Sequence, residues 1–86
     1  MYAVELSDNF GKIAKKLMKR NRGMLNAVYR KVAEIAENPY HYKPLRAPMQ
    51  GLRGVHIMGC FVLTYSIDEN AKTIKLVDFD HHDNVY

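Results

Sequence analysis

The chain has one cysteine, Cys60, among its 86 residues. A single thiol cannot form an internal disulfide and cannot alone hold a zinc ion, which excludes a disulfide scaffold and a cysteine-based zinc fold. We expect Cys60 to be a small apolar residue buried in a strand. Such sparing use of cysteine is consistent with a reducing compartment.

Long apolar runs are also missing, since no stretch approaches the roughly 18 residues that span a membrane. The first five residues, Met1 to Glu5, lack the basic-then-apolar layout of a signal peptide. We therefore expect a cytoplasmic protein that makes no membrane contact. A hydrophobic content of 48% with 26% charged residues is typical of globular chains. The length predicts one domain over residues 1–86, without a linker, a repeat or a low-complexity tract.

Acidic residues are scarce near the start of the chain. Up to position 31 only Glu5 and Asp8 oppose a set of basic residues, which are Lys12, Lys15, Lys16, Lys19, Arg20, Arg22, Arg30 and Lys31. The whole chain has a formal net charge of +4. This imbalance suits a phosphate backbone or an acidic protein partner, although a solvated helix face carries similar charges.

Two helical patterns follow a short strand that we expect over residues 2–6. In the first pattern Ser7 or Asp8 is a good N-cap, and apolar residues recur at helical spacing, at Phe10, Ile13, Ala14, Leu17 and Met18. Residues 21–23 end this helix, and a second apolar stripe continues to Asn38-Pro39, through Leu25, Val28, Tyr29, Val32, Ile35 and Ala36. A connection of about three residues predicts an antiparallel helical hairpin.

Three strand candidates fill the second half, over residues 53–58, 61–67 and 73–79, all rich in β-branched and aromatic residues. Their short connections allow only antiparallel neighbours. Both faces of residues 74–79 are apolar, which indicates a central strand. The prediction is an α+β fold in which the helical hairpin packs on one side of a mostly antiparallel four-stranded sheet, with the first strand at an edge.

The candidate site residues are histidines and cations. On the strand over residues 53–58, alternation places Arg53 and His56 on opposite faces, so both cannot point at one spot. The preceding loop must help, and it supplies Lys43 and Arg46. His82 follows the last strand and could approach His56 across the sheet, provided that the strands pair in a suitable order.

The run His81-His82-Asp83 contains residue types that bind metals. Consecutive residues of an extended chain point apart, however, and no distant third ligand is evident. We therefore expect no metal site and no cofactor.

The order of these elements resembles the RelE/ParE superfamily of toxins from toxin–antitoxin pairs. The resemblance covers essentially the whole chain, and it is carried by Asn38-Pro39, Lys43-Pro44-Leu45, Gly51-Leu52-Arg53, the strand over residues 61–68 and His82-Asp83-Asn84-Val85-Tyr86. It implies a RelE-like fold and a ribosome-dependent endoribonuclease that cuts messenger RNA. It also implies an acidic, RelB-like antitoxin, bound as a heterodimer or heterotetramer. The alternative is a non-catalytic, ParE-like toxin that inhibits a protein such as DNA gyrase.

Within the superfamily the chain resembles the histidine-using, YafQ-like branch more than RelE itself. RelE has arginines where this chain has His82 and the Val62-Leu63 pair. The YafQ-like branch has histidines at the positions of Lys43, His56 and His82, and a carboxylate at the position of Cys60. These differences put the strength of the activity, and the assignment of its proton transfers, in question.

The resemblance implies a cleavage reaction in which the 2′-hydroxyl attacks the neighbouring phosphate without a metal. Two histidines, with a reference pKa of about 6.5, could share the proton transfers. We assign His56 to the 2′-hydroxyl and His82 to the leaving group, and the reverse assignment is open. Lys43 and Arg46 would hold the phosphate, Arg53 would contact the RNA backbone nearby, and Tyr86 would stack on a base.

Overall fold

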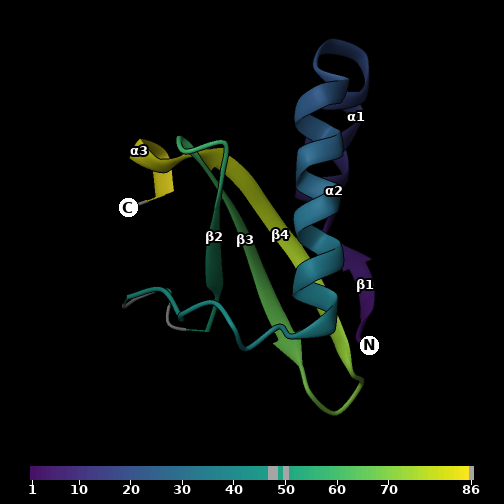
Figure 1. Ribbon diagram of the computed structural model, residues 1–86, viewed down its shortest axis with the longest axis vertical. Coiled ribbons are helices and arrows are strands. Elements are labelled where there is room, and N and C mark those ends of the chain that lie inside the picture. Colours follow the sequence, from purple (N-terminus) through teal and green to yellow (C-terminus); the bar gives the residue numbers. More distant parts are fainter. Residues whose placement is uncertain (47–48, 50, 86) are drawn as a thin grey trace.

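The computed structural model describes residues 1–46, 49 and 51–85 (Figure 1). Its elements in chain order are β1 (Ala3–Leu6), α1 (Asp8–Arg20), α2 (Arg22–Glu37), β2 (Arg53–Ile57), β3 (Phe61–Asp68), β4 (Thr73–His81) and α3 (His82–Val85). The predicted helices and strands are confirmed, with ends that differ by one or two residues. The sequence patterns did not reveal α3.

The four strands form one sheet in the order β1-β4-β3-β2. The strands β2, β3 and β4 are an antiparallel meander, whereas β1 pairs with β4 in parallel. The predicted places of β1 at an edge and β4 in the centre are therefore confirmed. The second edge belongs to β2, which lies on the far side of β3 from β4 (Figure 1).

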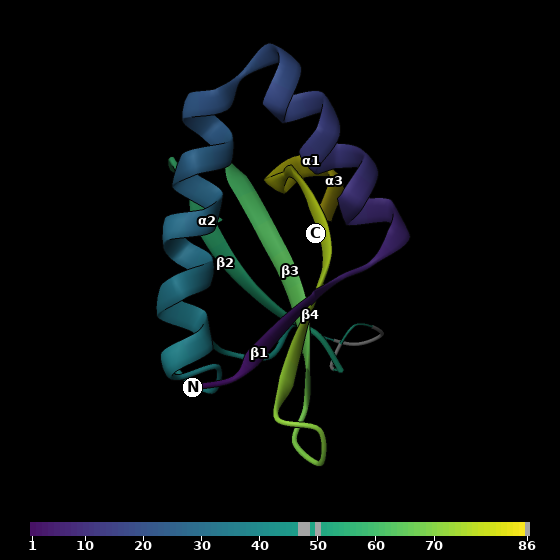
Figure 2. The same ribbon diagram turned by 90° about the vertical axis from the view of Figure 1, so that its right-hand side faces the viewer.

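The connection between the helices is one residue long, not about three. The backbone N–H of Asn21 donates to the Leu17 carbonyl at 2.7 Å, and its side-chain oxygen accepts from the Met24 N–H at 3.1 Å. Asn21 thus ends α1 and also caps α2, so the helical spacing resumes at once. From this corner the two helices diverge in a V over one face of the sheet (Figure 2).

The hydrophobic core lies between the helices and the sheet. Its fully buried members are Phe10, Val28 and Ile35 from the helices and Leu63, Tyr65, Ile74 and Leu76 from the strands. Ser7 fixes the entry to α1, because its hydroxyl oxygen accepts from the Phe10 N–H at 3.0 Å and its hydroxyl donates to the Val77 carbonyl at 2.9 Å. One side chain therefore joins the first helix to the central strand.

A β-bulge in β4 explains the imperfect alternation of that strand. Thr64 pairs with Asp78 and Tyr65 with Leu76, so Val77 is an extra residue on β4. A bulge reverses the side-chain order from that point onward. Ile74 and Leu76 consequently enter the core, and so does Phe79, while Asp78 and Asp80 lie on the opposite face of β4.

Cys60 is exposed and lies in the turn between β2 and β3, which corrects the expectation of a buried strand residue. The turn spans Met58, Gly59 and Cys60, with positive φ at the first two, and Cys60 lies outside both strands. The chain reverses direction there, so no neighbouring strand covers the thiol. Among the described residues, no helix has the length and apolarity needed to cross a membrane.

Candidate functional site

The face of the sheet that points away from the helices carries the candidate chemistry. Two rows of paired residues cross it: Gly54, Thr64 and Asp78 in one row, and His56, Val62 and Asp80 in the other. His56 belongs here because its neighbours Val55 and Ile57 are buried in the core, and strand side chains alternate. The His56 side chain is exposed.

The loop between α2 and β2 covers part of this face. Val62 and Thr64 are buried, at 0% and 2% exposure, although they point away from the helices. Leu45 provides the cover, since a Cβ built on Gly54 would meet the Leu45 Cδ2 atom at 3.0 Å. The Leu45 N–H donates to the Leu52 carbonyl at 2.9 Å, which ties the loop to the start of β2.

Lys43 and Arg46 stand on either side of Pro44-Leu45 in this loop, and both side chains are exposed. Pro44 forms a bridge with Arg53, and the Arg46 carbonyl accepts from the Met49 N–H at 2.8 Å. Because Leu45 rests on the neighbours of His56, the two cations lie at the rim of the His56 face. Figure 1 shows the loop and α3 on the same side of the sheet, away from α2.

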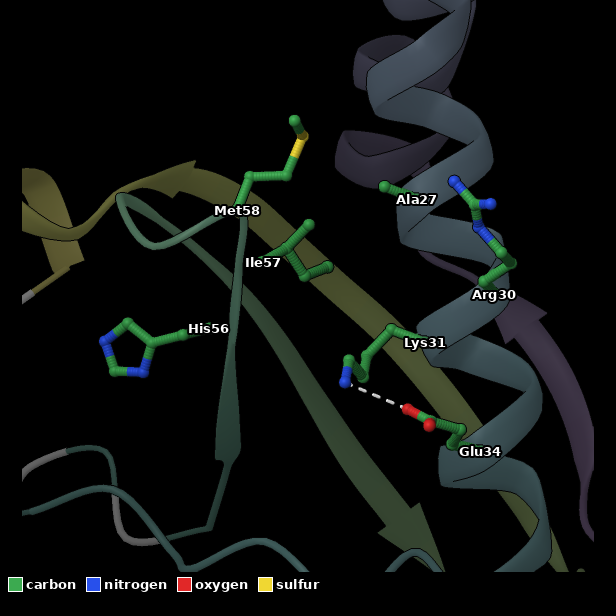
Figure 3. A pocket seen from close by; sticks show the side chains of 7 residues that line it. All are labelled: Ala27, Arg30, Lys31, Glu34, His56, Ile57 and Met58. Atoms are coloured by element: carbon green, nitrogen blue, oxygen red, sulfur yellow. Dashed lines mark ion pairs between the residues drawn. The ribbon is translucent and has the colours of Figure 1, made fainter.

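A groove of about 300 Å³ lies on the other side of β2, between that strand and α2, and is lined by Ala27, Arg30, Lys31, Glu34, His56, Ile57 and Met58. Lys31 Nζ contacts Glu34 Oε2 there at 2.9 Å. Figure 3 shows that His56 borders this groove but directs its imidazole away from α2. The groove is therefore separate from the face that gathers the loop cations.

His82 is half-buried at the point where β4 ends and α3 begins. Its backbone N–H donates to the Cys60 carbonyl at 2.9 Å, so the end of β4 is joined to the turn between β2 and β3. Its Nδ1 atom lies 3.1 Å from Asp83 Oδ1. His56 is on β2 one residue before the end of that strand, so both histidines lie at the same end of the sheet.

The lateral separation of the two histidines follows from the pairing. His56 pairs with Val62, and Val62 pairs with Asp80, two residues before His82. Two strand spacings of about 4.8 Å put the backbones of β2 and β4 roughly 10 Å apart. A phosphodiester group fits within that separation. The site is an open face rather than a deep cleft.

Arg53 lies on the core side of β2, opposite to His56, and is partly buried. Its Nη1 atom donates to the Tyr42 carbonyl at 2.5 Å, and its guanidinium lies 5.1 Å from the centre of the Tyr40 ring. These contacts hold the start of the loop in place. The structure therefore gives Arg53 a positioning task, and its contact with RNA stays a prediction.

Sequence reasoning missed two carboxylates on this face, Asp78 and Asp80. The Asn9 amide donates to Asp78 at 3.0 Å. The Asn84 amide and the backbone N–H of His81 both donate to Asp80 and hold its pKa below the usual range. Their spacing could have identified them, because residues two apart in a strand point to the same face. Their charge repels phosphate from β4, so a polyanion would lie nearer to β2 and the loop.

Tyr86, the predicted stacking residue, lies outside the described residues. The described candidates thus fall into two groups. Lys43 and Arg46 lie at the rim of the face that carries His56, and His82 lies at the same end of the sheet as His56, whereas Arg53 supports the loop from the other side.

Known proteins are similar to this chain over its full length. A 49% identical relative from Methanocaldococcus jannaschii, named "Putative toxin RelE4", matches all of this chain and 92% of its own length. A metal-bound toxin from Helicobacter pylori is 30% identical, with complete coverage of both chains and a TM-score of 0.80. The RelBE2 toxin–antitoxin complex from Mycobacterium tuberculosis contains a chain with 26% identity and a TM-score of 0.75, over 94% of this chain and 91% of that one.

The family model described as the ParE toxin of the type II toxin–antitoxin system, parDE, matches residues 4–86. The match extends from β1 to α3 and agrees with the RelE-type relatives. The chain therefore belongs to this family of toxins, within the RelE/ParE superfamily that the sequence motifs predict.

Proposed function

We propose that this toxin is a ribosome-dependent endoribonuclease that cuts messenger RNA. The observation that supports the proposal is the arrangement of one face of the sheet. His56 lies on that face, His82 lies at the same end of the sheet, and the loop that carries Lys43 and Arg46 covers part of the face. Two imidazoles and two cations are the groups that metal-independent RNA cleavage requires.

In the proposed reaction, His56 takes the proton of a 2′-hydroxyl group. The 2′-oxygen then forms a bond to the adjacent phosphorus, and the bond from phosphorus to the 5′-oxygen breaks. His82 gives a proton to that departing oxygen, so the products are a 2′,3′-cyclic phosphate and a 5′-hydroxyl end. The exchanged assignment of the two histidines gives the same products.

Charge builds up on the phosphate oxygens during this reaction, and Lys43 and Arg46 would stabilise it. Lys43 is suited to this task, because the ammonium group of a lysine is a compact charge with three donors for phosphate oxygens. Tyr86 would stack on a neighbouring base. The ribosome would hold the messenger RNA extended over the open face. The ribosome would thus orient the substrate, a task that a deep cleft performs in other enzymes.

The antitoxin is proposed to be an acidic chain that binds the toxin in the cytoplasm as a heterodimer or heterotetramer. The family is defined by toxin–antitoxin pairs, and a solved relative is a complex of the two. The lysines of α1 face outward in this toxin, which suits an acidic partner. An antitoxin bound over the His56 face would block RNA directly. An antitoxin bound elsewhere would have to inhibit cleavage by displacing the loop that carries Lys43 and Arg46.

The test is cleavage of a translated message by the purified toxin, with the RNA ends mapped by primer extension. We expect cuts on ribosomes only, and a fall of about 10²-fold or more for His56→Gln and for His82→Gln. His41→Gln is the matched control, because His41 is exposed in the same loop but contacts Tyr42 by its ring edge. Equal cutting by all four proteins would refute the roles of His56 and His82.

A second candidate function is suggested by the matching family model, which is that of ParE toxins. In that case the chain would bind a protein such as DNA gyrase and catalyse nothing. Intact messages together with inhibition of DNA supercoiling by the purified toxin would support this function. Inhibition of supercoiling would then persist in His82→Gln, because His82 has no chemical role in a protein that only binds.

A further inference from the structure

The side chains of His81, His82 and Asp83 gather in one cluster at the junction of β4 and α3. The two imidazole centres are 4.5 Å apart, and one possible ligand atom from each of the three residues lies within 4.8 Å of the others. The sequence predicted that these residues would point apart. That prediction is wrong because the strand turns into a helix at His82, so successive side chains no longer alternate.

The separations within the cluster match those of ligands around a metal ion. His82 Nδ1 is 3.1 Å from Asp83 Oδ1, and His81 Nδ1 is 3.5 Å from Asp83 Oδ2. Two ligands bound to zinc at about 2.0–2.1 Å in tetrahedral geometry are themselves roughly 3.3 Å apart. Small rotations of the side chains would therefore complete three corners of a tetrahedron, and water would fill the fourth.

The surroundings hold the cluster in this arrangement. The His81 ring packs edge-on against Phe61, with ring centres 5.7 Å apart, and the backbone of His82 is fixed to Cys60 by a hydrogen bond of 2.9 Å. The Asn84 amide donates to Asp80 at 3.1 Å and anchors α3. The Asp83 N–H donates to His81 Nδ1 at 3.2 Å, so that nitrogen carries no proton, and its lone pair would exchange this hydrogen bond for the ion.

We propose that His81, His82 and Asp83 bind one divalent ion of the zinc class. Two imidazoles and one carboxylate suit Zn²⁺, and they suit Ca²⁺ and Mg²⁺ poorly, since these prefer oxygen ligands. All three side chains are accessible, at 38%, 41% and 74% exposure, so the ion can enter from solvent. The alternative is that the three residues form only exposed ion pairs, which contribute little to the free energy of folding.

One consequence rests on the proposed function. The imidazolium form that gives up a proton carries hydrogen on both ring nitrogens, so a His82 ring that holds an ion on one nitrogen cannot act as that acid, and the ion would inhibit RNA cleavage. The metal would thus switch the toxin off without an antitoxin, and a chelator would restore cutting.

The test of binding uses the untagged toxin and Zn²⁺ alone, by equilibrium dialysis and by calorimetry. We expect one ion per chain, and an affinity at least about tenfold weaker for His81→Gln and for Asp83→Ala. His41→Gln and Cys60→Ser are matched controls that remove a histidine and the thiol elsewhere, and circular dichroism verifies the fold of each variant. Wild-type affinity in His81→Gln and Asp83→Ala, or no bound zinc in the wild type, would overturn the proposal.

RNA cleavage in the presence of Zn²⁺ tests the consequence separately. We expect wild-type cutting to fall in step with zinc occupancy and His81→Gln to require about tenfold more zinc for the same inhibition. Zinc binding by a toxin that never cuts RNA would support the metal site and refute the nuclease. Cutting that continues at full occupancy would refute the role of His82 as proton donor.

Discussion

Leu45 packs directly onto Gly54, so closely that a Cβ at position 54 would lie 3.0 Å from Leu45 Cδ2 and 3.2 Å from Val62 Cγ1. This contact holds the basic loop against the sheet. It therefore determines where Lys43 and Arg46 stand relative to His56.

Gly54→Ala should displace the loop and weaken the site. We expect the free energy of unfolding to fall by about 1–3 kcal/mol, as for other overpacked positions, and RNA cleavage to fall as well. Gly11→Ala is the control, because a Cβ at position 11 would meet no described atom within 4 Å apart from its chain neighbours and the backbone of its own helix. Alanine also favours a helix over glycine by up to about 1 kcal/mol. Urea unfolding of both variants measures the difference. Unchanged stability and cleavage in Gly54→Ala would mean that the loop position does not matter.

Arg53→Lys separates the positioning role of Arg53 from a contact with RNA. Lysine keeps the charge but lacks the planar group that lies over Tyr40 and reaches the Tyr42 carbonyl. We expect a loss of about 1–2 kcal/mol in unfolding free energy, with reduced cleavage. Thermal unfolding and the salt dependence of RNA binding should be measured together. Full stability with weaker RNA binding would instead assign Arg53 to the substrate.

Tyr65→Phe tests a hydrogen bond inside the core. The Tyr65 hydroxyl donates to the Pro39 carbonyl at 2.7 Å, and burial raises the pKa of that hydroxyl to about 12. Without the hydroxyl the buried carbonyl of Pro39 loses its donor, at a cost of about 1–3 kcal/mol. Tyr29→Phe, at an exposed position on α2, should change stability by less than about 0.5 kcal/mol. Equal unfolding midpoints in the two variants would disprove the contribution of the bond.

Glu69→Gln should alter the response of the fold to acid. The Glu69 carboxylate contacts Lys72 and accepts hydrogen bonds from Tyr40 at 2.6 Å and Tyr2 at 2.7 Å, which lower its pKa from 4.5 to about 2. A folded-state pKa below the unfolded value gives stability that is complete above pH 4.5 and is lost as the pH falls toward 2.

Wild type should therefore exceed Glu69→Gln in urea midpoint at pH 7, and the two should converge as the pH falls from about 5 to 2. Because the group is exposed, solvent keeps the effect modest. Glu37→Gln removes another exposed carboxylate and is the control for net charge. A gap between wild type and Glu69→Gln that stays constant with pH would contradict the lowered pKa.

The sequence was sufficient to predict every element except α3, because the core residues repeat at helical or strand spacing. Phe10, Ala14, Val28 and Ile35 mark the buried faces of the helices, and Leu63 and Ile74 mark those of the strands. Short connections then left one arrangement for the meander. The sequence pattern predicts a break of three residues between the helices, at residues 21–23, whereas the real break is Asn21 alone. The difference arises because Asn21 caps both helices, and that double role depends on both helices at once.

The site was less predictable, because it depends on contacts between distant segments. Alternation alone placed His56 on the outer face, but the cover by Leu45 required the path of the loop. The outward direction of Asp78 and Asp80 depends on the bulge at Val77, which local spacing does not specify. The cluster at His81, His82 and Asp83 depends on a helical turn of four residues, too short to leave a periodic signal.

The parallel pairing of β1 with β4 joins residues 3–6 to residues 73–76, so the two ends of the chain close the sheet together. A chain emerging from the ribosome can build its helices early, but β1 must wait for the synthesis of β4, which follows all the other strands. Until β4 has been made, β1 has no partner strand in the sheet. The fold is therefore completed late, which leaves time for a partner that is made beforehand to reach the toxin.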